Sequence, residues 1–250
     1  MVLVIKFIDR NIGNLLCNFL SLFNKKKTAF GAKIGRILVV QLWGMGETIL
    51  TLPAIEALRK NFPKAEIDVL ATQRNKNVYF NNKSINNVIS IKLNPISILK
   101  FILKNMKKYD FAIDMEEYLN ISAIISFFAG KKSIGYSHNP RARLYTNKIK
   151  YNDRQHASQT FLDLVRSLEV VYNFEKLPKL NFSKNDRNFV DKFLKNNGIK
   201  SSDFVVCVAP GAAESAKARM WPYDRYAELC DEVIAKHDAK IIFAGALNEN

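Results

Sequence analysis

From residue 36 onward the chain alternates between short apolar runs and stretches that suit helices. The apolar runs predict strands with no face in water, because they lack the polar alternation of a half-exposed strand. Such strands, separated by helices, are typical of a parallel sheet covered on both faces, and the pattern therefore predicts an α/β fold. The expected strands span 36–42, 66–71, 88–93, 111–115 and 132–136, and the expected helices span 47–61, 95–108, 116–129 and 156–173.

A second alternation follows a polar, linker-like segment that contains Pro178. Two parallel strands cannot bury both faces of a sheet, so we expect the chain to be truncated within this second domain. The expected elements are a helix at 184–196, a strand at 203–210, a helix at 222–237 and a strand at 240–245. We predict three parts, which are an N-terminal helical segment (1–34), a first Rossmann-like domain (35–175) and an incomplete second one (176–250).

The N-terminal segment has apolar side chains at three- and four-residue steps and ends in three lysines. This spacing predicts an amphipathic helix with a wide apolar face. The helix could be an in-plane membrane anchor, or it could dock on the globular body, and the sequence leaves both open. The apolar positions are Ile5, Ile8, Ile12, Leu15, Leu16, Phe19, Leu20 and Phe23.

The formal net charge of +15 is concentrated in two short segments. Residues 1–36 contain seven basic residues and one acidic residue, and residues 131–154 have the same balance. Clustered positive charge favours an anionic partner, such as a phospholipid surface or a phosphorylated glycolipid. We do not expect nucleic acid, because no zinc finger, RNA-binding signature or recognition-helix pattern occurs.

The sequence shows neither a membrane-spanning run nor the pattern of a secretory signal, and with its few cysteines it suggests a protein of the reducing cytosol. The apolar runs are far shorter than a membrane span, and the basic cluster follows the first apolar stretch instead of preceding it, unlike a secretory signal. Cys17, Cys207 and Cys230 lack metal-ligand spacing, so we expect buried thiols and no metal site.

The first candidate motif lies where the strand 36–42 leads into a helix, in the sequence Gly44-Met45-Gly46-Glu47. Glycines allow a tight turn and close approach of backbone to a ligand, and a helix N-terminus favours negative charge. The dinucleotide-binding fingerprint is incomplete, because no third glycine follows. The carboxylate of Glu47 could be a helix cap or a catalytic base.

The second candidate motif is the loop after the strand 203–210. Small residues from Gly211 onward are followed by Lys217 and Arg219, and Pro222 suits the first turn of the next helix. A small-residue loop with cations can bind a diphosphate, although a connecting loop with solvated charges would have the same composition.

Five stretches, taken together and in order over residues 36–250, resemble glycosyltransferase family 9, the heptosyltransferases that build the lipopolysaccharide inner core. Each stretch alone is weak evidence, and the series is fairly specific to the family. The stretches are ILVVQLWGMGETILTLPAIEALRKNFPKAEIDVL, YDFAIDMEEYLNISAIISFFAGKKSIGY, QHASQTFLDLV, VAPGAAESAKARMWPYDRYAEL and IIFAGALNEN.

The resemblance implies an inverting, metal-independent transferase of the GT-B type, with a nucleotide sugar as co-substrate, ADP-heptose being the expected one. It implies that Glu47 is the base, where the family more often has Asp. Glu116 and Glu117 stand where the family has Gln and Gly. The implied donor-binding residues are Gly211, Ala212, Lys217, Arg219 and Glu249, and the implied acceptor-binding residues are Gly44, Gly46, Asp114, Arg141 and Arg143.

The implied reaction is displacement at the anomeric carbon with ADP as the leaving group. The expected partners are a nucleotide sugar, a phosphorylated lipid-linked saccharide and an anionic membrane surface, and the protein is expected to be a monomer at the cytoplasmic face of the inner membrane. For His156, which opens a helix, we expect a capping or packing role. Alternatives are an inactive truncated fragment and a basic protein that binds anionic ligands.

Overall fold

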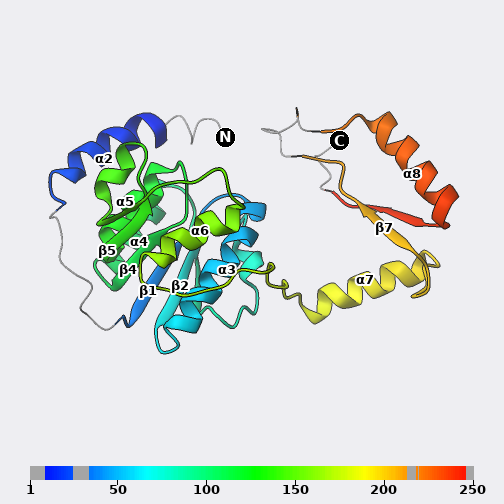
Figure 1. The fold of residues 1–250 in the computed structure, drawn as a ribbon, viewed down its shortest axis with the longest axis horizontal. Helices are drawn as coiled ribbons and strands as arrows, with labels where there is room; N and C mark the ends of the chain where they lie inside the picture. The colour runs from blue at the N-terminus through cyan, green and yellow to red at the C-terminus, as the bar shows by residue number, and fades with distance from the viewer. Residues whose placement is uncertain (1–8, 25–33, 213–217, 219, 246–250) are drawn as a thin grey trace. The chain divides into compact units, whose positions relative to one another are not determined.

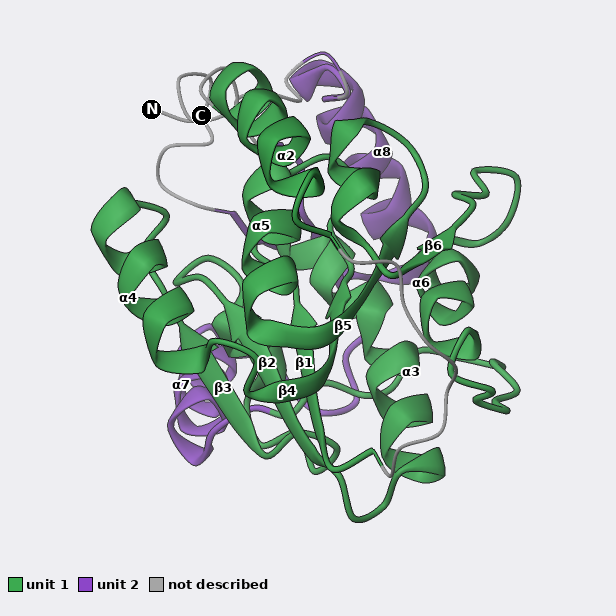
Figure 2. Cartoon of the chain, turned by 90° about the vertical axis from the view of Figure 1, so that its left-hand side faces the viewer, with its two compact units in different colours: residues 1–181 green, residues 182–250 purple. Residues whose placement is uncertain are grey.

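A computed structural model describes residues 9–24, 34–212, 218 and 220–245 (Figure 1). The chain divides into two compact units, residues 1–181 and 182–250 (Figure 2). Each unit is an α/β structure built on parallel strands, so the predicted fold class is confirmed.

Unit 1 contains a six-stranded parallel sheet in the order β3-β2-β1-β4-β5-β6. In this order the chain moves outward in one direction from β1 to β3 and then returns to the other side of β1 with β4. The carboxyl ends of β1 and β4 therefore flank the topological switch point, where α/β proteins bind ligands. The strands are β1 (Arg36–Val40), β2 (Glu66–Ala71), β3 (Asn87–Ser90), β4 (Tyr109–Asp114), β5 (Gly130–Tyr136) and β6 (Asn147–Ile149).

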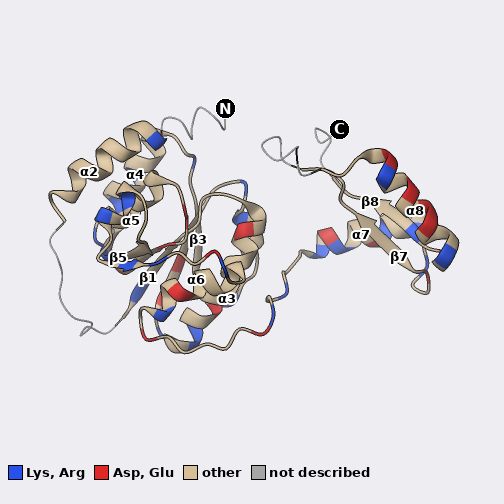
Figure 3. Ribbon diagram, turned by 45° about the horizontal axis from the view of Figure 1, so that its top comes forward, with Lys and Arg blue, Asp and Glu red and all other residues tan. Residues whose placement is uncertain are grey.

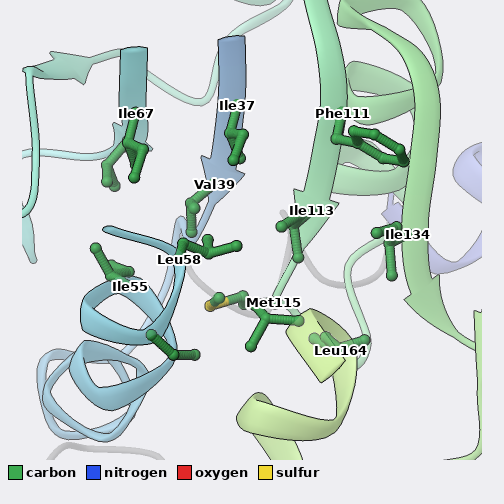
Figure 4. Packing of buried hydrophobic residues seen from close by; sticks show 14 of the residues in the cluster. Ile37, Val39, Ile55, Leu58, Ile67, Phe111, Ile113, Met115, Ile134 and Leu164 are labelled. Atoms are coloured by element: carbon green, nitrogen blue, oxygen red, sulfur yellow. The ribbon is translucent and has the colours of Figure 1, made fainter. Parts of the chain in front are cut away.

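Helices cover both faces of this sheet, as its apolar strands require (Figure 2). On one face, α3 (Met45–Asn61) and α6 (Ala157–Arg166) pack against Ile37, Val39 and Ile113 of the central strands (Figure 4). The other face is covered by α2 (Asn14–Ser21), α4 (Pro95–Asn105) and α5 (Asn120–Ala129). Short helical turns occur at Asp9–Gly13 (η1), Lys76–Tyr79 (η2) and Pro140–Leu144 (η3).

The described part of the N-terminal segment docks on unit 1. Asp9 accepts hydrogen bonds from the backbone N–H groups of Asn120 (2.8 Å) and Ile121 (2.9 Å), at the start of α5. Cys17 of α2 is fully buried, and its Sγ lies 3.7 Å from the side-chain oxygen of Asn120 on α5. The docked alternative therefore holds for residues 9–24, and residues 1–8 and 25–33 lie outside the described part.

Unit 2 contains α7 (Lys184–Asn196), β7 (Val205–Val208), α8 (Tyr223–His237) and β8 (Lys240–Phe243). The two strands pair in parallel. A capping box between Ser183 and Asp186 fixes the start of α7. Cys207 on β7 is exposed, so the expectation that all three thiols are buried was wrong for this residue, while Cys17 and Cys230 are buried.

None of the helices in the described ranges is long and apolar enough to cross a membrane. The same residues contain no group of three or more His, Cys, Asp or Glu side chains placed to hold a metal ion.

Candidate active site at the carboxyl edge of the first sheet

Glu47 occupies the third position of α3, directly after the loop that follows β1. Its side chain is exposed, and no described residue forms a hydrogen bond or ion pair with its carboxylate. It therefore does not cap the helix through a side-chain bond, and the carboxylate is free to accept a proton from a bound molecule. Glycine is required at the helix cap beside it, because Gly44 has φ +44° and a Cβ there would lie 2.5 Å from Glu47 Oε2.

The loop that leads to Glu47 is held from the β4 side by Glu116. Its Oε1 atom accepts hydrogen bonds from the backbone N–H groups of Leu42 (2.6 Å) and Trp43 (2.7 Å). Glu116 is buried, and burial, reinforced by the charge of Asp114, raises the pKa of its carboxyl to about 7. In the sequence Glu116 stood out only because it departs from the family pattern. In the structure it positions the loop before Glu47.

The same loop is held from the β2 side by Asn75 and Thr72. Asn75 donates from its amide nitrogen to the carbonyl of Gln41 (2.8 Å) and to the hydroxyl of Thr48 (2.9 Å), and Thr72 donates to the carbonyl of Leu42 (3.0 Å). Both side chains are buried. The backbone between β1 and α3 is therefore bonded on both sides before any ligand binds, which is the kind of preorganisation that a catalytic group needs.

Asp114 and Arg141 form a fully buried ion pair, with 2.7 Å between Arg141 Nη2 and Asp114 Oδ2. The same carboxylate oxygen accepts hydrogen bonds from Tyr145 (2.6 Å) and Ser122 (2.9 Å). Burial raises the pKa of Asp114, and the charge of Arg141 and these hydrogen bonds act in the opposite direction. The other carboxylate oxygen accepts from the backbone N–H of Glu116 (3.0 Å), so the pair supports the residue that holds the loop.

The expectation that Asp114 and Arg141 touch an acceptor does not fit this structure. Neither side chain has exposed surface, and each satisfies the other's charge. They act as positioning residues beneath the site. Arg143, two residues further on, is exposed and donates to the side-chain oxygen of Asn18 on α2 (2.8 Å), so this cation does reach the surface.

An aromatic cluster lies beside Glu47 at the ends of β4 and β5. His138 contacts the rings of Tyr118 (centroids 6.1 Å apart) and Tyr151 (5.7 Å), and its Nε2 lies 2.9 Å from the carbonyl oxygen of Glu117. The Glu117 carboxylate raises the pKa of Tyr118 to about 12, and the negative charge of Glu47 acts in the same direction. Sequence reasoning gave His138 no role and missed this cluster, because its members come together only through the sheet.

Of the expected donor-binding residues, Gly211 and Ala212 lie in the loop after β7, three and four residues beyond its end, and are half-buried. Trp221, in the segment that leads to α8, packs edge-on against Tyr226 with 5.1 Å between ring centroids. Lys217, Arg219 and Glu249 lie outside the described residues. His156 was expected to cap or pack at the start of a helix. Its side chain accepts a hydrogen bond from the Ser158 N–H (3.2 Å) at the start of α6, so the capping role is confirmed.

Comparison with solved structures identifies the fold as GT-B-like. A glycosyl transferase of family 9 from Veillonella parvula superposes with a TM-score of 0.74 at 20% identity, over 86% of this chain and 64% of that one. Escherichia coli heptosyltransferase WaaC, solved with ADP-2-deoxy-2-fluoro heptose, gives 0.62 at 21% identity, over 86% of this chain and 70% of that one. ADP-heptose lps heptosyltransferase II of E. coli gives 0.64 at 18% identity, over 86% and 65%.

Sequence comparison gives the family. Lipopolysaccharide heptosyltransferase 3 of E. coli is 26% identical over 113 residues, which are 41% of this chain and 33% of that protein. The chain thus spans only a third of this curated relative's length in the matched region. The model of glycosyltransferase family 9 (heptosyltransferase) matches residues 100–250, more than half of the chain. The chain therefore belongs to glycosyltransferase family 9, the heptosyltransferase family.

Proposed function

We propose that this chain is the catalytic-base lobe, with part of the donor lobe, of an inverting glycosyltransferase that uses ADP-heptose. The single observation that carries the proposal is the carboxylate of Glu47, unpaired among the described residues, in the first turn of α3, after a loop that is hydrogen-bonded on both sides, at the topological switch point. Relatives whose names include heptosyltransferase, and the solved complex of one of them with an ADP-heptose analogue, support the choice of donor.

In the proposed reaction Glu47 accepts the proton of an acceptor hydroxyl. The hydroxyl oxygen forms a bond to the anomeric carbon of the donor on the face opposite the diphosphate, and the bond from that carbon to the diphosphate oxygen breaks. ADP leaves with the bonding electron pair. Backbone N–H groups at Gly211 and Ala212, with Lys217 and Arg219, would stabilise the negative charge that develops on the diphosphate.

We propose that the aromatic cluster beside Glu47 binds the acceptor saccharide. Tyr118 is exposed, and Glu117, His138 and Tyr151 are partly exposed, so rings and a carboxylate are available to a sugar. Sugar C–H faces pack on aromatic rings, and carboxylates accept hydrogen bonds from hydroxyls. Gly44 and Gly46 would let the acceptor approach the backbone, and Arg143 would bind an acceptor phosphate. The acceptor we propose is a lipopolysaccharide-type lipid-linked saccharide at the cytoplasmic face of the inner membrane.

The experiment compares wild-type, Glu47→Gln and Glu47→Asp proteins in donor binding and in sugar transfer. Calorimetry with ADP-heptose should give similar affinities for all three, because Glu47 belongs to the acceptor side. Transfer should fall by about two orders of magnitude or more in Glu47→Gln, and Glu47→Asp should keep much of it, because the carboxylate remains. Near-normal transfer by Glu47→Gln would contradict the assigned base, and failure to bind any nucleotide sugar would contradict the proposed function.

A further inference from the structure

The outer sides of α2 and α4 carry an unusual number of exposed large apolar side chains. The two helices lie on the same face of the sheet and both contact α5, which has no charged residue (Figure 2). Monomeric proteins rarely leave large apolar surface of this kind uncovered. The exposed residues, each between 43% and 79% accessible, are Ile12, Leu15, Leu16, Phe19, Leu22 and Phe23 around α2, and Ile96, Leu99, Leu103 and Met106 on and after α4.

The spacing shows that each helix presents one apolar stripe outward while a different stripe packs inward. On α4, Leu99 and Leu103 are one turn apart and exposed, whereas Phe101 and Ile102 are buried against the sheet. On α2, Phe19 is exposed and Cys17 is buried. The inner faces of both helices are therefore already used, and the outer faces need a second partner.

The charges around this surface are positive. Residues 91–108 contain five lysines and no acidic residue. Two of them, Lys100 and Lys104, lie on α4 and directly follow Leu99 and Leu103 in the sequence (lysine and arginine are blue in Figure 3). Residues 10–24 contain Arg10 and no acidic residue. Asp9, which precedes α2 in the sequence, already accepts two hydrogen bonds from the backbone of α5.

We propose that the outer faces of α2 and α4 together form a docking surface for an anionic lipid bilayer. Apolar side chains flanked by lysines suit helices that lie in the plane of the membrane interface, where anionic lipid attracts the nearby cations. A second copy of the chain fits less well, because pairing two such faces would bring their lysines together. The inference goes beyond the proposed function, since lipid binding does not require sugar transfer.

The position of the surface suits an enzyme that acts on a lipid-linked molecule. The α5 N-terminus, to which Asp9 binds, follows directly after the loop that contains Glu116 and Glu117. Asn24 and Asn18 of the α2 region bond to Arg143 through its carbonyl oxygen (2.7 Å) and its guanidinium (2.8 Å). The surface thus borders the acceptor side of the candidate active site within unit 1.

The experiment is co-sedimentation of the full chain with phosphatidylcholine vesicles that either contain or lack phosphatidylglycerol. Wild-type protein should bind the anionic vesicles, and added salt should weaken the binding. The double variant Leu99→Glu/Leu103→Glu on α4 and the variant Leu15→Glu on α2 should each lower the partition coefficient by about tenfold or more, because apolar area is lost from the bilayer contact. The matched control is Val171→Glu, an exposed apolar position beside the end of α3 on the opposite face, which should bind as wild type does.

Circular dichroism of each variant verifies that helix content is retained. Loss of binding in Leu15→Glu but not in the α4 variant would overturn the two-helix surface. Equal binding to both kinds of vesicle would overturn the role of the lysines. A concentration-dependent dimer, abolished by Leu99→Glu/Leu103→Glu and accompanied by no vesicle binding, would show that the face joins two copies of the chain instead. Each of these results is independent of whether the chain transfers sugar.

Discussion

Glu116 binds the backbone of Trp43 with one carboxylate oxygen, at 2.7 Å, and thereby ties the end of β4 to the loop after β1. The same oxygen also accepts a hydrogen bond from the Leu42 N–H. The two backbone N–H groups therefore need a hydrogen-bond acceptor at this position, and a neutral side-chain oxygen can serve as well as a negatively charged one. Burial raises the pKa of the carboxyl to about 7, which makes this contact sensitive to pH in the neutral range. The groups that face it are Asp114 and Arg141, whose charges have opposite effects on its pKa.

Replacing Glu116 by Gln should make unit 1 less sensitive to pH. The folded pKa of about 7 lies above the ordinary 4.5, so the fold favours the neutral carboxyl. Wild-type stability is therefore highest below about pH 4.5 as far as this group is concerned, and it falls by about 3 kcal/mol as the pH rises through 7. Gln keeps the acceptor oxygen and cannot ionise. Urea unfolding from pH 5 to 8 should show a flatter profile for Glu116→Gln.

Fluorescence can report unit 1 alone if Trp221 is replaced by Phe, because Trp43 is the other tryptophan of the chain. The control is Glu117→Gln, one residue further on, whose side chain does not bond the β1 loop and whose profile should follow wild type. If Glu116→Gln keeps the wild-type slope, then Glu116 does not titrate in this range and the assigned cause is wrong.

Removing one member of the buried ion pair should be costly. Arg141→Met leaves Asp114 without its cation in a site that has no exposed surface, so the free energy of unfolding should fall by about 3–5 kcal/mol. The double variant Arg141→Met/Asp114→Asn should recover part of this loss, because it removes the unpaired charge. Arg143→Met is the control, since Arg143 is exposed and should change stability by less than about 1 kcal/mol. Equal effects at the two arginines, measured by urea unfolding, would refute the buried-pair assignment.

The two glycines of the first motif should respond oppositely to alanine. Gly44 has a positive φ, and a Cβ there would meet Glu47 Oε2 at 2.5 Å, so Gly44→Ala should destabilise unit 1 by about 1–2 kcal/mol and displace the Glu47 side chain. A Cβ at Gly46 would meet nothing within 4 Å, and this residue lies in the first turn of α3. Gly46→Ala should therefore stabilise by about 0.4–1 kcal/mol. The measurement is thermal unfolding, and a stabilising Gly44→Ala would contradict the described turn.

The fold was predictable because the inner strands of unit 1 are buried on both faces and therefore have apolar sequences. All five expected strands of the first sheet are present. The strand that was missed is β6 (Asn147–Ile149), an edge strand of three residues with an exposed lysine at its centre, which is too short and too polar to form an apolar run. The helix expected at 116–129 begins only at Asn120, because the residues before it form the loop that contains Glu116 and Glu117.

The site was only partly predictable. Glu47 could be found because a carboxylate after two glycines at a helix start is a local pattern. The role of Glu116 could not, since it depends on hydrogen bonds to residues more than 70 positions earlier in the chain. Arg141 was expected to bind the acceptor, but it lies in η3 and is buried against Asp114 at the end of β4, 27 positions earlier in the chain. Contacts across a parallel sheet leave no trace in local sequence spacing.

Cys17 offers a direct test of whether α2 stays docked when the protein meets a membrane. Its thiol is fully buried between α2 and α5, and burial raises its pKa to about 12, so it should resist a thiol reagent, whereas the exposed Cys207 should react quickly. The double variant Cys207→Ser/Cys230→Ser leaves Cys17 as the one cysteine of the chain, so the labelling rate then reports this thiol alone. If the lipid surface is the outer side of a docked α2, Cys17 should remain protected when anionic vesicles are added. Rapid labelling only in the presence of vesicles would mean that α2 leaves unit 1 to enter the bilayer, and the contact between Asp9 and α5 would then open in the bound state.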